Sequence, residues 1–329
     1  MMFLKRVIIF AILMSLGLMI ESTLSYAQEK YPSRGIELAI PWPPGGSTDI
    51  AGRIFANELN KVLKVPITPV NKPGASGTIG ATYVYKAKKD GYTLFSGSLG
   101  WLLGSITLGG IPYDPLKDFI PITNISTTPH GIFVNKDSPI KTLEDLLDKA
   151  KKNPKSIPCG TAGISSDGHF NIEIFQKAAG IVIKHVPFKG VGEVPPALLG
   201  GHIEIGIGVA SAWLPFVRSG DVRALVITGT SRMKDLPSIA TFQEKGYKQT
   251  FFNNWVGLFA PVGVPPSVVD TLAQASEKVI KSKEFIDSIE KTGSVVEYVT
   301  SAEYLKALEE ERKVADTIAK ELGLKQSKN

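Results

Sequence analysis

Cysteine is almost absent from this sequence: Cys159 is the only one among 329 residues. A single cysteine excludes an internal disulfide, so the fold depends on its hydrophobic core alone. After the N-terminal 27 residues, no apolar stretch reaches the roughly 20 residues that cross a bilayer. The four histidines lack metal-ligand spacing, and neither a Walker motif nor a complete nucleophile elbow occurs. The sequence therefore gives no indication of a metal site or a cofactor.

Positive charge is present but not concentrated. The formal net charge is +6, and the lysines are scattered over helix-like segments. A nucleic-acid footprint would gather them in one patch or stripe, so we expect no nucleic-acid partner. A mildly basic surface remains compatible with small anionic solutes.

The N-terminal apolar run has the layout of a secretory signal. Lys5 and Arg6 precede the run at 7–20, and the small residues Ser25 and Ala27 have the spacing of a cleavage site. We expect residues 1–27 to be a cleaved signal peptide and the mature protein to be periplasmic. The alternative is a membrane anchor, for which the run is short, since a spanning helix needs about 20 residues.

Short apolar runs alternate with segments of helical period along the rest of the chain. The expected strands cover 36–42, 65–71, 91–98, 131–138, 156–163, 182–188, 203–209, 222–228 and 255–261. The expected helices cover 48–63 (with Ile50, Ile54, Leu59 and Val62 at core spacing), 76–87, 142–150, 166–179, 194–199, 267–281 and 301–322. This alternation is typical of an α/β fold with mainly parallel sheets, and the length suits two domains. No linker separates them, so we expect the chain to cross between them more than once.

Three glycine-rich segments, at 44–49, 73–78 and 160–166, lie where an expected strand ends and a helix begins. Ligands of open parallel sheets bind at such places. Glycine lets backbone N–H groups approach a ligand, and a helix N-terminus adds about half a positive charge, so an anion can be held without a basic side chain. None of the three contains arginine, which excludes a guanidinium clamp there. Each alone could be a capped turn; together they predict a shared anion-binding cleft.

Asp49 has two interpretations. Near a helix start and four residues before Arg53, it could form a simple helix-surface ion pair. In an anion site it would repel the ligand, so a functional role would be contact with a donor group or positioning of a water.

A secreted hydrolase is the rival class of function. Ser165 or Ser166 could share a helix face with His169. No orienting acid and no elbow supports such a triad, so we expect a protein that is not an enzyme.

Ten motifs follow one another in the order of a known family. They include "PPGGSTDIAGR" (43–53), "VNKPGASGTIGA" (70–81), "GTAGISSDGH" (160–169), "HVPFKG" (185–190) and "WVGLFAPVGVP" (255–265). With these motifs the mature chain resembles the periplasmic solute-binding proteins of tripartite tricarboxylate transporters, also called Bug receptors.

The resemblance implies a two-lobed periplasmic-binding-protein fold of type II, in which each lobe is a mainly parallel sheet flanked by helices. The chain would cross twice between the lobes, and the ligand cleft would lie between them. Lobe 1 would comprise residues 28–127 and 253–329, and lobe 2 residues 128–252. The family captures organic carboxylates and delivers them to a membrane permease, and we expect a monomer. A sensor that signals to a membrane kinase would have the same fold and stays open as an alternative.

The resemblance also places the ligand contacts on the glycine-rich loops, with backbone amides and hydroxyls as donors. They are Gly45, Gly46, Ser47, Thr48, Asp49, Ala75, Ser76, Gly77, Ser96 and Ser98 on the first lobe, and Thr161, Ala162, Gly163, Ser165, Ser166 and Ser211 on the second. Trp42 and Phe188 depart from the family's usual residues. Together with Trp213 they either make part of the cleft aromatic, which would suit an aromatic carboxylate, or pack in the core.

Overall fold

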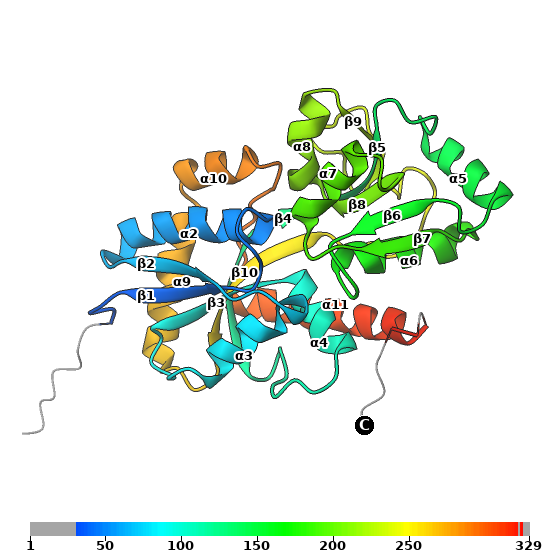
Figure 1. The fold of residues 1–329 in the computed structure, drawn as a ribbon. Helices are drawn as coiled ribbons and strands as arrows, with labels where there is room; N and C mark the ends of the chain where they lie inside the picture. The colour runs from blue at the N-terminus through cyan, green and yellow to red at the C-terminus, as the bar shows by residue number, and fades with distance from the viewer. Residues whose placement is uncertain (1–30, 322, 325–329) are drawn as a thin grey trace, which may run out of the picture. The chain divides into compact units, whose positions relative to one another are not determined.

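The computed structural model describes residues 31–321 together with 323 and 324. The expected signal peptide, residues 1–27, lies outside the described residues. Within the described part, no helix combines the length and the apolar character of a membrane span. The chain from Arg34 onward forms one compact unit built on two five-stranded sheets (Figure 1).

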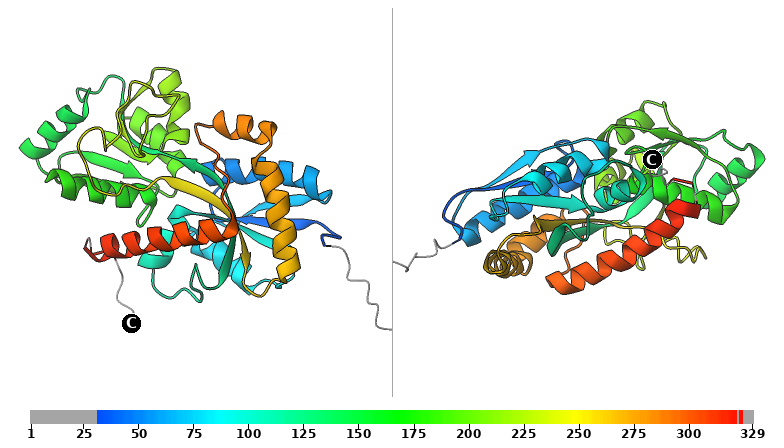
Figure 2. Two further views of the ribbon diagram at one scale, coloured as in Figure 1. Left: turned by 180° about the vertical axis from the view of Figure 1, so that it is seen from behind. Right: turned by 90° about the horizontal axis from the view of Figure 1, so that it is seen from below.

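The first sheet has the strand order β2-β1-β3-β10-β4. Its strands are β1 (Ile36–Ile40), β2 (Ile67–Asn71), β3 (Thr93–Ser98), β4 (Phe119–Thr128) and β10 (Asn254–Pro261). One face is covered by α2 (Ser47–Leu63), α9 (Pro266–Ile280) and α10 (Lys283–Glu290). The other is covered by the 3-10 turn η1 (Ala75–Gly77), α3 (Thr78–Lys86), α4 (Leu99–Thr107) and α11 (Ser301–Glu321). Figure 2 shows the long helix α11, in red, running beside this sheet, where it contacts β4 and α4.

The second sheet has the order β7-β6-β8-β5-β9. Its strands are β5 (His130–Asn135), β6 (Pro158–Thr161), β7 (Lys184–Pro187), β8 (Ile205–Val209) and β9 (Val222–Ile227). Helices α5 (Leu143–Lys152) and α6 (Asp167–Ala179) share one hydrophobic cluster with it. The 3-10 turn η2 (Val191–Glu193) leads into α7 (Val194–Leu199), and α7 packs with α8 (Ala210–Arg218) in a second cluster.

The two-lobed α/β fold is confirmed, and each sheet is mixed in one strand only, since four strands run in one direction and the fifth runs against them. In the first sheet β10 is the reversed strand, and in the second sheet β5 is. Each of these strands is the one that the chain enters from the other lobe. It therefore starts at the edge where the parallel strands end, and must run against them. β4 ends at Thr128 and β5 begins at His130, so the first passage between the sheets is one residue long.

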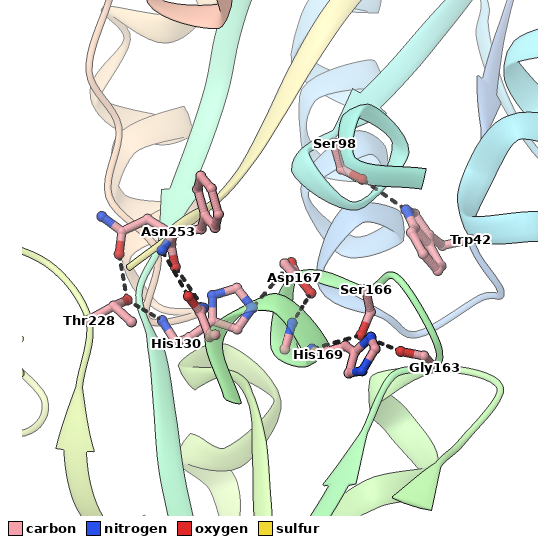
Figure 3. A network of polar contacts seen from close by, with 12 residues as sticks. Trp42, Ser98, His130, Gly163, Ser166, Asp167, His169, Thr228 and Asn253 are labelled. Carbon is pink, nitrogen blue, oxygen red and sulfur yellow. Dashed lines mark hydrogen bonds and ion pairs between the residues drawn. The ribbon is translucent and has the colours of Figure 1, made fainter. Parts of the chain in front are cut away.

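The two passages are tied together by side chains. The His130 backbone N–H donates to Thr228 Oγ1 at 2.8 Å, and the Thr228 hydroxyl donates to Asn253 Oδ1 at 2.6 Å (Figure 3). Asn171 of α6 binds the backbone of Phe252, the residue before Asn253. Its Nδ2 donates to the Phe252 carbonyl at 3.0 Å, and its Oδ1 accepts from the Phe252 N–H at 2.9 Å. Both Asn171 and Phe252 are buried, so water does not reach the Phe252 backbone freely. The Asn171 side chain therefore satisfies the hydrogen-bonding groups of that backbone.

Several local features follow the sequence closely. Thr142 and Asp145 form both bonds of a capping box at the start of α5, the helix expected over 142–150. Gly180 ends α6 in the left-handed region, with φ of 63°. Cys159 is fully buried in β6, as expected for a small core residue.

Candidate functional site

The loop between β1 and α2 exposes backbone where most helices have a side-chain cap. The N-cap residue of α2 is Gly46, which has no side chain to accept from the first N–H groups. Gly45 before it has φ of 85°, a conformation that other residues adopt with strain. The positive end of the α2 dipole is thus left available to an outside acceptor.

Asp49 holds this loop in place. Its carboxylate accepts hydrogen bonds from the Gly45 N–H at 3.0 Å, from Arg53 Nε at 2.9 Å and from Asn71 Nδ2 at 2.7 Å. Asn71 Nδ2 also donates to the Trp42 carbonyl at 2.9 Å. Burial raises the pKa of Asp49, but the hydrogen bonds from Arg53, Asn71 and Gly45 lower it further, so the net pKa lies below its usual value. The expected ion pair with Arg53 is present, and the carboxylate is occupied by the protein's own donors.

A cavity of about 340 Å³ opens in front of this loop, lined by residues of both lobes. Of the residues expected in the site, it brings together Gly45, Gly46, Ser47, Thr48, Ser98 and Ala162. Its other lining residues are Trp42, Pro43, Pro44, Gly100, Asp167, Gly168, Lys189, Gly190, Val191, Gly192, Glu193, Ile207, Gly208, Val209 and Asn254.

Four helix N-termini meet at this cavity. Those of α2, α4 and α8 have no side-chain cap, and their first residues or N-caps (Gly46, Ser98 and Val209) line the cavity. The fourth, α6, is capped by Ser166, whose Oγ accepts from the His169 N–H. Three uncapped helix ends around one cavity favour an anion, because their dipoles add at the same place.

The remaining expected residues lie around the cavity rather than on its wall. Ser96 is fully buried behind it, and Thr161 Oγ1 contacts His185 Nε2 at 2.6 Å. Ser76 instead reaches the other lobe, where its hydroxyl donates to the Ile164 carbonyl at 3.3 Å. The others in this group are Asp49, Ala75, Gly77, Gly163, Ser165, Ser166 and Ser211. As ligand contacts, all of these stay predictions.

Only one of the two tryptophans singled out in the sequence lies at the cavity. Trp42 lines it, and its indole Nε1 donates to Ser98 Oγ at 2.9 Å (Figure 3). Trp213 is fully buried, stacks on Phe133 with ring centroids 4.7 Å apart, and covers Gly206 so closely that a Cβ there would come within 2.2 Å of the indole. Packing in the core therefore accounts for Trp213.

Lobe 2 contributes lining residues that sequence reasoning missed. Val209 ends a parallel strand, and the rule that ligands bind at carboxyl strand ends would have found it. Asp167 follows directly on an expected loop but carries the wrong charge for an anion site. The segment 189–193 has glycine at 190 and 192 between the expected strand 182–188 and the expected helix 194–199, so the signal used for the other three loops was present there and was overlooked.

The arrangement of Ser166 and His169 does not suit a hydrolase. The Ser166 hydroxyl donates to the Gly163 carbonyl at 2.8 Å and accepts from the His169 backbone N–H at 3.2 Å, so it is a helix cap. His169 Nδ1 accepts from the Ser165 backbone N–H at 3.1 Å, and Nε2 lies 3.8 Å from Glu173. Neither ring nitrogen is placed to take a proton from a serine hydroxyl.

The buried His169 makes stability sensitive to acid. Burial, with His185 stacked against the ring, lowers the pKa of His169 from 6.5 to about 4. The unfolded chain therefore takes up this proton at a higher pH than the folded protein. The contribution of His169 is fully present above pH 6.5 and is lost as pH falls toward 4, so we expect this contribution to the free energy of unfolding to drop by about 2 kcal/mol between pH 8 and pH 5. Burial raises the pKa of Glu311 to about 7, which changes stability in the opposite direction over this interval, so the contribution of His169 is obtained by comparison with a His169 variant.

Urea denaturation at pH 8 and pH 5 measures this drop. His169→Gln, which keeps an acceptor for the Ser165 N–H, should lose less stability over the same interval. An equal drop in the variant and the unmodified protein would show that other groups cause the acid sensitivity.

A family model described as "Tripartite tricarboxylate transporter family receptor" matches residues 51–324. The chain belongs to this receptor family. Protein BugT of Bordetella pertussis is 31% identical over 268 residues, covering 81% of this chain and 82% of BugT. Two solved structures are similar throughout: Rpa4515 of R. palustris with adipate (TM-score 0.84, 28% identity, 89% of this chain and 98% of that one) and MatC of Rhodopseudomonas palustris with bound malate (TM-score 0.81, 27% identity, 88% and 99%).

Members of the receptor family are periplasmic solute-binding proteins, and the protein is a solute receptor of that kind. The cavity between the glycine loops lies where such a receptor needs a binding site, at the carboxyl ends of strands from both sheets.

Proposed function

We propose that the protein captures a small organic carboxylate in the cavity between its lobes and delivers it to a membrane permease of the tripartite tricarboxylate type. The observation that carries this proposal is the meeting of three uncapped helix N-termini, those of α2, α4 and α8, at one cavity. Their N–H groups can hold a carboxylate without an arginine. Adipate and malate, carried by two of the similar structures, are both carboxylates.

The remaining parts of the proposal follow from the same fold. The lobes would divide into residues 28–127 with 253–329 and residues 128–252, and they would close on the ligand as rigid bodies about the two passages. The protein would be exported by a cleaved signal at 1–27 and would act as a periplasmic monomer. The loop residues named as ligand contacts from sequence would donate to the carboxylate, Gly46 to Thr48 foremost, except Asp49, whose carboxylate would hold the loop instead.

A thermal-shift screen tests the proposal. Protein freed of carried-over ligand by unfolding and refolding is heated with a panel of mono-, di- and tricarboxylates, amino acids and aromatic acids. A carboxylate present at 100 times its dissociation constant should add about 2.7 kcal/mol to the stability and raise Tm visibly.

The matched controls are the corresponding amides, such as succinamide for succinate, which keep the shape and lose the charge. Stabilisation by the acid and not by the amide is the expected result. A folded protein that no carboxylate stabilises, or that amides stabilise equally, would contradict the proposal.

A further inference from the structure

The cavity has a negative side as well as a positive one. Three charged side chains line it: Asp167, Lys189 and Glu193. Lys189 and Glu193 lie on an exposed loop, and the Glu193 carboxylate accepts from the Lys189 backbone N–H at 3.2 Å. Asp167 differs from both because its side chain is only 14% exposed. It therefore interacts with whatever fills the cavity more strongly than a charge in open solvent does.

Asp167 is held in place by its neighbours. Its Oδ1 accepts from the Gly168 backbone N–H at 2.9 Å, and its Oδ2 lies 3.1 Å from Nε2 of the fully buried His130 (Figure 3). Burial raises the pKa of Asp167, but His130 and the nearby backbone N–H groups lower it more, so the net pKa lies below its usual value. The group is thus an ionised carboxylate at neutral pH, and it accepts hydrogen bonds without donating any.

An ionised carboxylate has about four acceptor positions; the Gly168 N–H occupies one of them, and His130 Nε2 lies 3.1 Å from the other oxygen. No arginine or lysine is paired with Asp167 among the described residues. A ligand made only of carboxylate and hydrocarbon would bring like charge toward this group in a cavity of about 340 Å³. Such an approach is unfavourable unless the ligand itself supplies a donor.

We propose that Asp167 is a specificity-determining residue that accepts a hydrogen bond from an ammonium or hydroxyl group of the ligand, so that the receptor prefers amino and hydroxy acids to unsubstituted carboxylic acids. In this arrangement the ligand carboxylate lies toward the uncapped helix ends, and the donor group faces Asp167 on the lobe 2 wall. His130 acts as a positioning residue, since it contacts Asp167 and does not line the cavity. The inference rests on the proposed capture of a carboxylate.

Matched ligands of equal carbon skeleton test it on the unmodified protein. Succinate, malate and aspartate differ only in H, OH or NH3+ on one carbon, and glutarate, 2-hydroxyglutarate and glutamate form a second series. Propionate, lactate and alanine form a third, and phenylpropionate, phenyllactate and phenylalanine a fourth. Calorimetric titration should show, in whichever series binds, the donor-bearing member about ten-fold or more tighter than the donor-free acid, as a hydrogen bond to a charged group predicts. Which donor binds tighter separates a hydroxy-acid from an amino-acid receptor.

Asp167→Asn keeps the size of the side chain and removes its charge. In this variant the preference for donor-bearing ligands should collapse to about two-fold or less, and the donor-free acid should bind more tightly than to the unmodified protein. The control is Glu284→Gln, which removes an exposed carboxylate from the first turn of α10, on a helix that contributes nothing to the cavity. It should keep the full preference.

The outcomes separate the two proposals. A donor-free acid that binds the unmodified protein as tightly as its partners, or a preference that survives in Asp167→Asn, overturns the role of Asp167 and leaves carboxylate capture intact. If no acid of any series binds and no member of the wider thermal-shift panel stabilises the protein, carboxylate capture itself fails, and the role of Asp167 with it. The preference is the ratio of two affinities measured on the same protein. A change in the stability of the variant therefore does not change the conclusion.

Discussion

Replacing Asn171 with leucine is expected to lower the free energy of unfolding by about 4 kcal/mol. The two side chains have similar volumes, so packing changes little. The Phe252 N–H and carbonyl, however, each lose the partner that Asn171 supplies at 2.9 and 3.0 Å. Phe252 is only 2% exposed, so water does not reach these groups freely, and each unsatisfied group costs about 1–3 kcal/mol. Urea denaturation measures the loss.

Asn57→Leu is the matched control. Asn57 lies exposed on α2 and donates only to the neighbouring Glu58 at 3.1 Å. We expect its stability to stay within about 0.5 kcal/mol of the unmodified protein. Similar losses in both variants would mean that the clamp on Phe252 contributes nothing beyond the loss of an amide.

Asp49→Ala is expected to weaken binding of the carboxylate found by the screen by about 100-fold, which corresponds to about 2.7 kcal/mol. The effect is indirect, because Asp49 does not line the cavity. In the variant, the Gly45 N–H loses the carboxylate acceptor that fixes the loop. The N–H groups before α2 are then no longer held in a single conformation. The ligand must then order the loop itself, at the expense of affinity.

Asp287→Ala removes a comparable i, i+4 partner from Lys283 on α10, where both side chains are exposed. Calorimetric titration should find its affinity unchanged within about two-fold, since exposed helix pairs contribute only about 0.3–0.5 kcal/mol. Full affinity in a folded Asp49→Ala protein would show that the loop keeps its shape without this carboxylate.

The strand and helix order was largely predictable, and the exceptions have physical causes. Helix α4 was missed because eight of its nine residues are buried, so no polar face marks a helical period. Helix α2 was found, and Leu59 is buried as expected, but the rest of its inner face differs. Ile50 is 39% exposed, while Phe55 and the small residue Ala56 are buried against the sheet and its neighbouring helices. The largest aliphatic side chains were taken to face the core, whereas small ones let α2 approach its neighbours closely.

The loop before α2 was predictable because its chemistry is backbone chemistry, whereas the expected second glycine-rich loop at 73–78 does not line the cavity. Glycine at a strand end followed by a helix indicates exposed N–H groups, and Gly45, Gly46 and Thr48 line the cavity as expected. Which residues of lobe 2 line the cavity depends instead on how the two sheets are placed relative to each other. A local sequence pattern does not predict that placement. Lys189 and Val191 line the cavity from a loop whose two glycines were overlooked, and Asp167 was passed over because its charge contradicts an anion site.

The solitary cysteine has a practical consequence for following the receptor in solution. Cys159 is fully buried, and burial raises the pKa of its thiol, so little nucleophilic thiolate exists at neutral pH. A maleimide dye would therefore attach only where a new cysteine is introduced. No native cysteine would therefore have to be removed before fluorophores are attached at cysteines introduced near Ser76 on lobe 1 and near Ile164 on lobe 2. These two residues contact each other between the lobes. Energy transfer between such labels would turn ligand occupancy into an optical signal without prior removal of any native residue.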